Sequence, residues 1–217
     1  MAHPMTSLDQ SPSPAADRKA QRIIAAAREA FLEQGYDGVS MDEVAKRAGV
    51  AKQTVYAHYA SKDALFLAVI DSVKGRVVSV ITAPGPLAIR DRLQRIAREL
   101  LELVLDPSTL SLLRIAMAAS YRFPTLGRSI WGSDVKEGHS VLADVIERAA
   151  KDGSLTVDDA SVAAGQFLAL VRGELHLRCL LDPSFRPPPA PIERQVEAAV
   201  DCFMARYGPP AASSGQT

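Results

Sequence analysis

Two short amphipathic segments on either side of Gly49 constrain the fold of this chain more than any other feature. Between residues 41 and 48 the apolar residues recur with helical spacing, at positions 41, 44, 45 and 48, which predicts a helix of two turns. Ser40 and Glu43 have the spacing of a capping box, in which each side chain accepts a hydrogen bond from the other residue's amide. Gly49 ends this helix, and a second short helix follows over about 52–59. Two such helices joined by a tight turn match a helix-turn-helix.

The outward face of the second helix has an unusual composition for a surface helix. At about 100° per residue, Gln53 and Ala57 face outward when Val55 faces inward. Beside this outward pair, or nearer the boundary with the interior, lie Thr54, Tyr56, Lys52 and His58. The resulting surface is small, mostly uncharged and rich in hydrogen-bonding groups.

The major groove of DNA suits such a surface. Gln53 can form a bidentate pair with the edge of adenine, and the Ala57 methyl can meet a thymine methyl. Phosphate oxygens suit the remaining polar groups, which position a protein without reading sequence: the hydroxyls of Thr54 and Tyr56 and the ammonium groups of Lys52 and Lys62. The amides that begin the helix after Ser61 could hold another phosphate. Ser40 and His58 complete the set of DNA-binding candidates.

A simpler interpretation is that these residues only solvate a short helix. Such a helix has little intrinsic stability, and an uncharged exposed face would gain nothing in water. Charge gives weaker support to DNA binding. Residues 17–62 contain eight Lys or Arg and six Asp or Glu, a difference of +2, and the whole chain has a formal net charge of zero. A globally basic nucleic-acid binder is therefore excluded, but a local basic patch is not.

The rest of the chain predicts an all-α protein of about nine helices. Ala and Leu abound, aromatic residues make up only 6%, and no alternating β pattern of useful length occurs. Residues that cannot continue a helix divide the remaining helical patterns, which cover about 17–35, 62–81, 87–105, 109–120, 126–151, 157–181 and 191–207.

The two ends and the cysteines indicate a soluble cytoplasmic protein. Residues 1–16 are rich in Ser and Pro and predict a disordered arm, and residues 208–217 predict a flexible tail. The N-terminus lacks the apolar run of a signal peptide, and no stretch approaches 18 uninterrupted apolar residues. Cys179 and Cys202 lie in apolar helical patterns without metal-ligand spacing. We therefore expect no metal and no cofactor.

The segment GYDGVSMDEVAKRAGVAKQTVYAHYASKDAL resembles the tetracycline-repressor-type (TetR) transcriptional regulators. The resemblance spans about residues 20–67, and the residues in register are Phe31, Gly35, Ser40, Val44, Ala45, Ala48, Gly49, Val50, Thr54, Tyr56, Tyr59, Ser61, Lys62 and Leu65. It implies that Thr54, Tyr56, His58 and Lys62 contact DNA or support residues that do. Lys52 and Gln53 depart from the common pattern of the family, which suggests contacts particular to one operator.

The resemblance also implies an architecture and a mechanism. A DNA-binding domain over 17–64 would join a ligand-binding and dimerisation domain over 65–207. The last two long helices, about 157–181 and 191–207, would pair with their mates in a homodimer. The two DNA-binding domains of such a dimer must enter successive major grooves about 34–36 Å apart. A small-molecule effector that tilts the body would therefore release a palindromic double-stranded operator.

Several polar or aromatic residues interrupt apolar patterns in the C-terminal part and are candidates for an effector pocket. They are Tyr121, Phe123, Trp131, Phe167, Arg172 and His176. Apolar walls with a few placed polar groups are typical of ligand pockets. The alternative, which the sequence favours, is that these residues belong to the core or to a dimer interface and are satisfied there.

Two other classes of function remain as alternatives. One is an enzyme or a helical small-molecule-binding protein with an incidental helix-turn-helix, although the chain has no GxSxG, GxxxxGK[ST] or HExxH motif. The other is a regulator that senses no ligand, or that activates transcription instead of repressing it. The expected function is thus a ligand-responsive DNA-binding repressor and not an enzyme.

Overall fold

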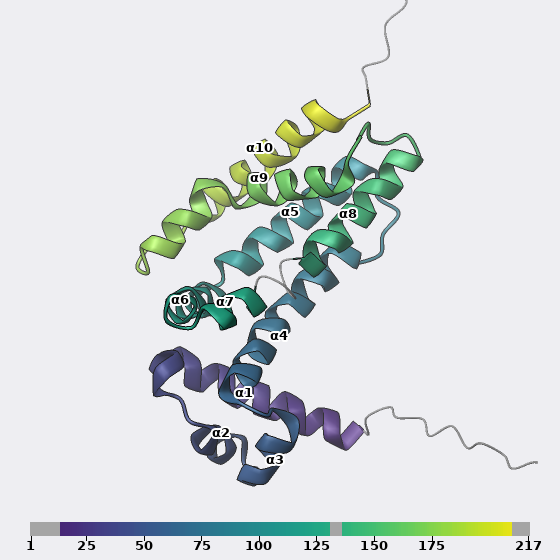
Figure 1. Cartoon of the computed structure of the whole chain (residues 1–217). Coiled ribbons are helices and arrows are strands. Elements are labelled where there is room, and N and C mark those ends of the chain that lie inside the picture. Colours follow the sequence, from purple (N-terminus) through teal and green to yellow (C-terminus); the bar gives the residue numbers. More distant parts are fainter. Residues whose placement is uncertain (1–13, 131–135, 210–217) are drawn as a thin grey trace, which may run out of the picture. The chain divides into compact units, whose positions relative to one another are not determined.

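The computed structural model describes residues 14–130 and 136–209, and within them the backbone forms ten α-helices and no strand (Figure 1). This confirms the all-α expectation. The helices are α1 (Pro14–Gly38), α2 (Met41–Ala48), α3 (Lys52–His58), α4 (Lys62–Thr82), α5 (Ile89–Leu105), α6 (Pro107–Arg122), α7 (Pro124–Ile130), α8 (Lys136–Lys151), α9 (Ala160–Leu181) and α10 (Pro189–Tyr207). The range expected as one helix over 126–151 contains α7 and α8, and residues 131–135 lie outside the described part.

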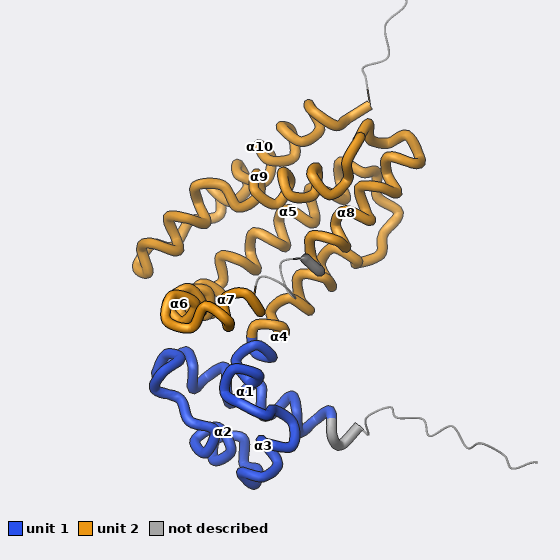
Figure 2. The backbone as a smooth tube through the Cα atoms, in the orientation of Figure 1, with its two compact units in different colours: residues 1–69 blue, residues 70–217 orange. Residues whose placement is uncertain are grey.

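The helices form two compact units, which meet in the sequence between Val69 and Ile70 of α4 (Figure 2). The first unit contains α1, α2, α3 and the first turns of α4. The second contains the rest of α4 and the helices that follow it. None of the described helices has the length and apolar character that a membrane crossing requires.

The core of the first unit forms because α1 and α2 each carry one apolar face. Its fully or almost fully buried side chains are Ile23, Ala27, Ala30, Phe31, Tyr36, Val39, Met41, Val44, Ala45, Ala48, Val55, Leu65, Phe66 and Val69. Helix α2 begins and ends as predicted. The Ser40 hydroxyl accepts from the Glu43 amide, and Gly49 takes left-handed backbone angles of φ 62° and ψ 40°. This glycine conformation turns the chain between α2 and α3.

One part of the predicted capping box differs in the structure. The Glu43 carboxylate accepts hydrogen bonds from Arg47 at 2.8 Å and from Gln34 at 2.5 Å. Arg47 also forms an ion pair with Glu33 of α1 at 2.6 Å. Glu43 therefore helps to join α2 to α1, because a guanidinium competes better for a carboxylate than a backbone amide does.

The second unit is built around α5, α8, α9 and α10, whose apolar faces share one core. Its large, fully buried side chains include Leu93, Ile96, Leu101, Phe167 and Phe203. Two ion pairs join α5 to α10, one between Arg98 and Glu193 and one between Arg90 and Asp201. Figure 1 shows α9 and α10 running side by side along this unit.

Helix α9 is interrupted at Gly173, which has φ 51° and ψ −161° in the middle of the helix. The Gln195 side chain of α10 approaches this point and donates to the Leu170 carbonyl at 2.6 Å. In a regular helix that carbonyl accepts from the amide of residue 174. A side chain of α10 therefore bonds the backbone of α9 where the helix is distorted.

Candidate nucleic-acid interface and ligand cavity

Helix α3 presents the face that the sequence predicted. Val55 is fully buried, whereas Gln53, Ala57 and Tyr56 are exposed, Tyr56 to 45%. Thr54 is half-buried beside them, and the remaining exposed positions of the helix are Lys52 and His58. The hydrogen-bonding surface is therefore free of packing within its own unit.

Hydrogen bonds to the backbone hold α3 in place relative to α2. Arg22 of α1 donates to the Ala48 carbonyl at 2.6 Å, at the end of α2. The Gly49 amide donates to the Lys46 carbonyl at 3.2 Å, and the Val50 amide donates to the Ala45 carbonyl at 3.1 Å. These bonds satisfy the last carbonyls of α2 and fix the turn that leads into α3.

Lys52, at the start of α3, is already paired within the unit. Its ammonium group lies 2.8 Å from a carboxylate oxygen of Asp42 in α2. This hydrogen bond raises the pKa of Lys52, so the side chain carries its charge at neutral pH. Both side chains are more than half exposed, and ion pairs of this kind are weak. A competing anion can therefore displace Asp42.

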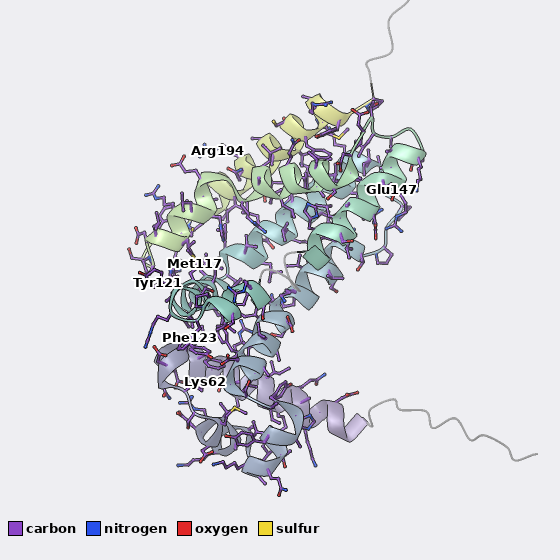
Figure 3. The ribbon with its side chains drawn as sticks, viewed as in Figure 1. Lys62, Met117, Tyr121, Phe123, Glu147 and Arg194 are labelled. Atoms are coloured by element: carbon purple, nitrogen blue, oxygen red, sulfur yellow. The ribbon has the colours of Figure 1, made fainter. Side chains whose placement is uncertain are left out.

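The Lys62 ammonium group is already bonded to backbone carbonyls of its own unit. Its ammonium group donates to the Tyr36 carbonyl at 3.0 Å and to the Asp37 carbonyl at 3.4 Å, and it lies 4.6 Å from the centre of the Tyr36 ring. Figure 3 labels this side chain in α4. Lys62 thus fixes the end of α1 to the start of α4.

Two serines are exposed at helix starts on the same unit. The Ser40 hydroxyl accepts from the Glu43 amide at 3.2 Å, and the Ser61 hydroxyl accepts from the Ala64 amide at 3.1 Å. Both hydroxyls act as helix caps. Each keeps its own O–H group available to donate.

The second unit contains a cavity of about 350 Å³ whose walls come from five helices. Most of the lining is apolar: Ile70, Val73 and Val77 of α4, Val104 of α5, Leu112, Leu113 and Ala116 of α6, and Ile130 of α7. The polar lining consists of Lys74, Thr109, Arg172 and His176. This volume lies at the lower end of the range for small-molecule sites.

Two of the six predicted pocket residues, Arg172 and His176, line this cavity. Phe167 does not, because its position in α9 directs it into the core, where its ring packs against Phe203 with centroids 5.2 Å apart. Tyr121 is 90% exposed and Phe123 is 38% exposed, both at the end of α6 (Figure 3). Trp131 lies outside the described residues.

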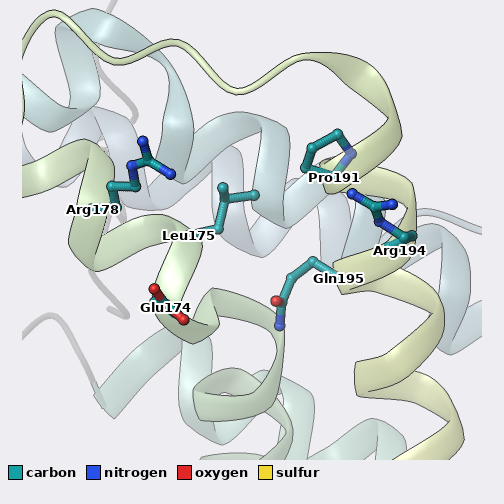
Figure 4. Close-up of a pocket in the computed structure, with 6 residues that line it drawn as sticks. All are labelled: Glu174, Leu175, Arg178, Pro191, Arg194 and Gln195. Atoms are coloured by element: carbon teal, nitrogen blue, oxygen red, sulfur yellow. The ribbon is translucent and has the colours of Figure 1, made fainter.

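The cavity walls from α4, α5 and α6 were not predicted as pocket residues. Their sequence signal is weak, because Val or Leu at helical spacing indicates a buried face and does not distinguish a filled core from a cavity. A second, smaller hollow of about 280 Å³ lies between α9 and α10 beyond Gly173 (Figure 4). Its lining is mostly polar and consists of Glu174, Leu175, Arg178, Pro191, Arg194 and Gln195. Among the described residues, no cluster of His, Cys, Asp and Glu has the arrangement of a metal site.

A helix-turn-helix with an exposed, hydrogen-bonding second helix defines a class of DNA-binding regulators, and comparisons with known proteins specify the family. Residues 23–69 match the family described as bacterial regulatory proteins, tetR family. Residues 91–209 match the family described as AefR-like transcriptional repressor, C-terminal domain. The chain belongs to the TetR family of transcriptional regulators, which are not enzymes.

Individual relatives agree with this assignment. The activator FasR of Mycolicibacterium smegmatis is 44% identical over 66 residues, which are 30% of this chain and 30% of FasR. The chain thus spans about a third of the length of the first curated relatives that it matches. A protein assigned to the TetR family from Mesorhizobium loti is 31% identical, with a TM-score of 0.80, over 90% of this chain and 100% of that one. The flavonoid-responsive regulator FrrA is 36% identical, with a TM-score of 0.71, over the same shares.

Proposed function

We propose that this protein is a repressor that binds a palindromic operator as a homodimer and is released by a small-molecule effector. The observation that carries the proposal is the exposed, mostly uncharged face of α3, centred on Gln53 and Ala57. The DNA-binding domain spans 17–64 and the effector-binding and dimerisation domain spans 65–207. Such a regulator acts in the cytoplasm, where the chromosome lies.

Each exposed side chain of α3 has a role in this proposal. Gln53 and Ala57 read bases in the major groove. Thr54, Tyr56, His58 and the Ser40 hydroxyl meet the phosphate backbone, together with Lys52 once it leaves Asp42. Lys62 supports this surface through its bonds to the end of α1.

The homodimer forms through α9 and α10. On α9, Val162, Leu177 and Leu181 are more than half exposed. On α10, Ala198, Cys202 and Ala205 are exposed at helical spacing. Apolar and small side chains at these positions allow two helix pairs to pack closely. The cavity beside α9 takes the effector, and a change in α9 alters the spacing of the two DNA-binding domains.

Two of the matched descriptions bear on the sign and the effector. The C-terminal domain resembles that of a repressor, and FrrA is a flavonoid-responsive regulator, so repression with ligand release is favoured. FasR is an activator. A reporter gene controlled by the operator distinguishes repression from activation, because deletion of a repressor raises expression and deletion of an activator lowers it.

A gel-shift experiment with DNA from the regulator's own upstream region tests this function. We expect a sequence-selective complex that contains two chains per operator, measured by light scattering of the complex. Replacing Gln53 with Ala should weaken operator binding about thirtyfold or more and relax the preference at one base pair per half-site, because one bidentate contact is lost in each of the two half-sites. A Glu147→Gln variant, changed on the exposed face of α8, is the control and should bind like the wild type. Failure to form a selective complex at any salt concentration would contradict the proposal.

Replacing Asp42 with Asn should tighten DNA binding to all sequences. Asp42 holds Lys52 through an ion pair, so its removal frees one cation and deletes one anion near the phosphates. We expect an increase in affinity of about two- to fivefold at low salt, which shrinks as salt rises. Glu33→Gln is the matched control, since Glu33 pairs with Arg47 and not with α3. Equal effects of the two variants would show that general charge, and not the release of Lys52, is responsible.

A further inference from the structure

The polar groups of the cavity differ in whether their charge is compensated. Lys74 of α4 forms an ion pair with Asp71 on its own helix, so its positive charge is neutralised nearby. Thr109 contributes only a hydroxyl. The described lining contains no Asp or Glu. The charge balance inside the cavity therefore depends on Arg172 and His176.

Arg172 has no ion pair and no hydrogen bond to any residue that the structure describes. Its side chain is solvent-accessible along the cavity wall, yet the surrounding protein desolvates the guanidinium and lowers its pKa. An arginine remains charged even so, because its ordinary pKa lies far above neutral pH. Because no carboxylate among the described residues pairs with this guanidinium, its N–H groups can donate to an anion that enters the cavity.

His176 lies one turn beyond Arg172 in α9 and lines the same cavity. Burial, and secondly repulsion from Arg172, lowers the pKa of its imidazole below the usual value. His176 is therefore neutral at pH 7 and can donate or accept one hydrogen bond without adding charge. Among the described residues that line it, the cavity therefore has one positive charge, that of Arg172, without a paired carboxylate.

We propose that the effector is a compact organic acid with a single negative charge, whose carboxylate pairs with Arg172 and whose apolar body fills the chamber formed by α4, α5 and α6. The inference rests on the proposed function only in naming this ligand as the effector. A guanidinium binds a carboxylate through two parallel hydrogen bonds. A neutral molecule would leave Arg172 unpaired, and a cation would be repelled by it.

Three probes of nearly the same shape and different charge test the proposal: 2-naphthoate, 2-naphthamide and protonated 2-naphthylmethylamine. Binding to the full-length protein is measured by calorimetry at pH 7. We expect the acid to bind at least about tenfold more tightly than the amide, because the charge-assisted pair is lost with the amide. The amine should not bind measurably.

Two variants connect this preference to one side chain. In Arg172→Gln the acid should lose its advantage, so that acid and amide bind within about twofold of each other, while affinity for the amide stays near the wild-type value. Arg148→Gln, an exposed arginine of α8 outside the cavity, is the matched control and should keep the full preference. An unchanged melting temperature without ligand shows that each variant is folded.

Three outcomes overturn the proposal: amide and acid binding equally to the wild type, a preference that survives in Arg172→Gln, or no binding of the acid at all. The calorimetric experiment contains no DNA, so its failure is distinct from failure of operator binding. Addition of 2-naphthoate to the operator complex then asks whether the bound acid releases DNA. If the acid binds at Arg172 and the complex persists, the ligand class stands and the effector role is wrong.

Discussion

Replacing Phe31 with alanine should unfold the DNA-binding unit while the second unit remains folded. Phe31 is fully buried and is one of three rings that pack against one another. Its ring centroid is 4.9 Å from that of Phe66 in an edge-to-face arrangement and 6.1 Å from that of Tyr36. Loss of a buried Phe side chain costs about 3–5 kcal/mol. Small units of this size have little stability to spare, so operator binding should be lost.

Native-state hydrogen exchange is the measurement suited to this prediction. The single tryptophan of the chain is residue 131, so tryptophan fluorescence does not report on the first unit. Amides of α1, α2 and α3 should exchange near the rate of an unfolded chain, and those of α5 and α10 should stay protected.

Tyr36→Phe is the matched control for the ring cluster. It keeps the ring and removes only the hydroxyl, which donates to Asp63. We expect a loss of about 1 kcal/mol in the free energy of unfolding and retained DNA binding. If Phe31→Ala left exchange in α1, α2 and α3 unchanged, the three rings would not be what stabilises this unit.

Local signals account for the part of the structure that the sequence predicted well. Ser40 and Gly49 bound α2 through hydrogen bonds and backbone angles that depend on residues a few positions away. Once Val55 is taken to face inward, helical geometry gives the directions of Gln53 and Ala57. Since the second helix is only two turns long, one buried residue fixes the direction of all its other side chains.

Long-range contacts account for the part that was not predicted. The cavity is formed by residues as far apart as Ile70 and His176, and helical periodicity does not show which apolar faces leave space between them. Phe167 was a candidate for a pocket or for the core, and only the packing of α9 against α10 decides that it lies in the core. Lys62 was predicted to contact DNA or to support residues that do, and no local pattern reveals that the Tyr36 and Asp37 carbonyls lie within its reach.

Replacing Gly173 with alanine should strongly destabilise the second unit. At φ 51° and ψ −161°, Gly173 has a backbone conformation that is essentially confined to glycine, and another residue there costs about 1–3 kcal/mol. A Cβ at this position would lie 2.5 Å from the Gln195 amide nitrogen. The Gln195 side chain would have to move and give up its hydrogen bond to Leu170, at a further cost of about 1 kcal/mol.

The free energy of unfolding, measured by urea titration with far-UV circular dichroism, tests this prediction. Gly75→Ala is the matched control, because Gly75 lies within α4 with no atom close to its would-be Cβ, and alanine there should be neutral or stabilise by up to about 1 kcal/mol. Gln195→Ala should cost only the hydrogen bond. The double variant Gly173→Ala/Gln195→Ala should lose less stability than the sum of the two single variants. Shortening the Gln195 side chain removes the steric clash with the new Cβ at position 173.

The same substitution also tests whether the backbone of α9 at Gly173 determines where the Arg172 guanidinium lies in the cavity. Arg172 directly precedes Gly173, so a change in the backbone at this point redirects the guanidinium relative to the cavity. In Gly173→Ala the preference for 2-naphthoate over 2-naphthamide should fall even where the protein remains folded. If Gly173→Ala kept wild-type stability and the full preference for the acid, the position of Arg172 in the cavity would not depend on this glycine conformation. Gln195 would then have no part in positioning Arg172.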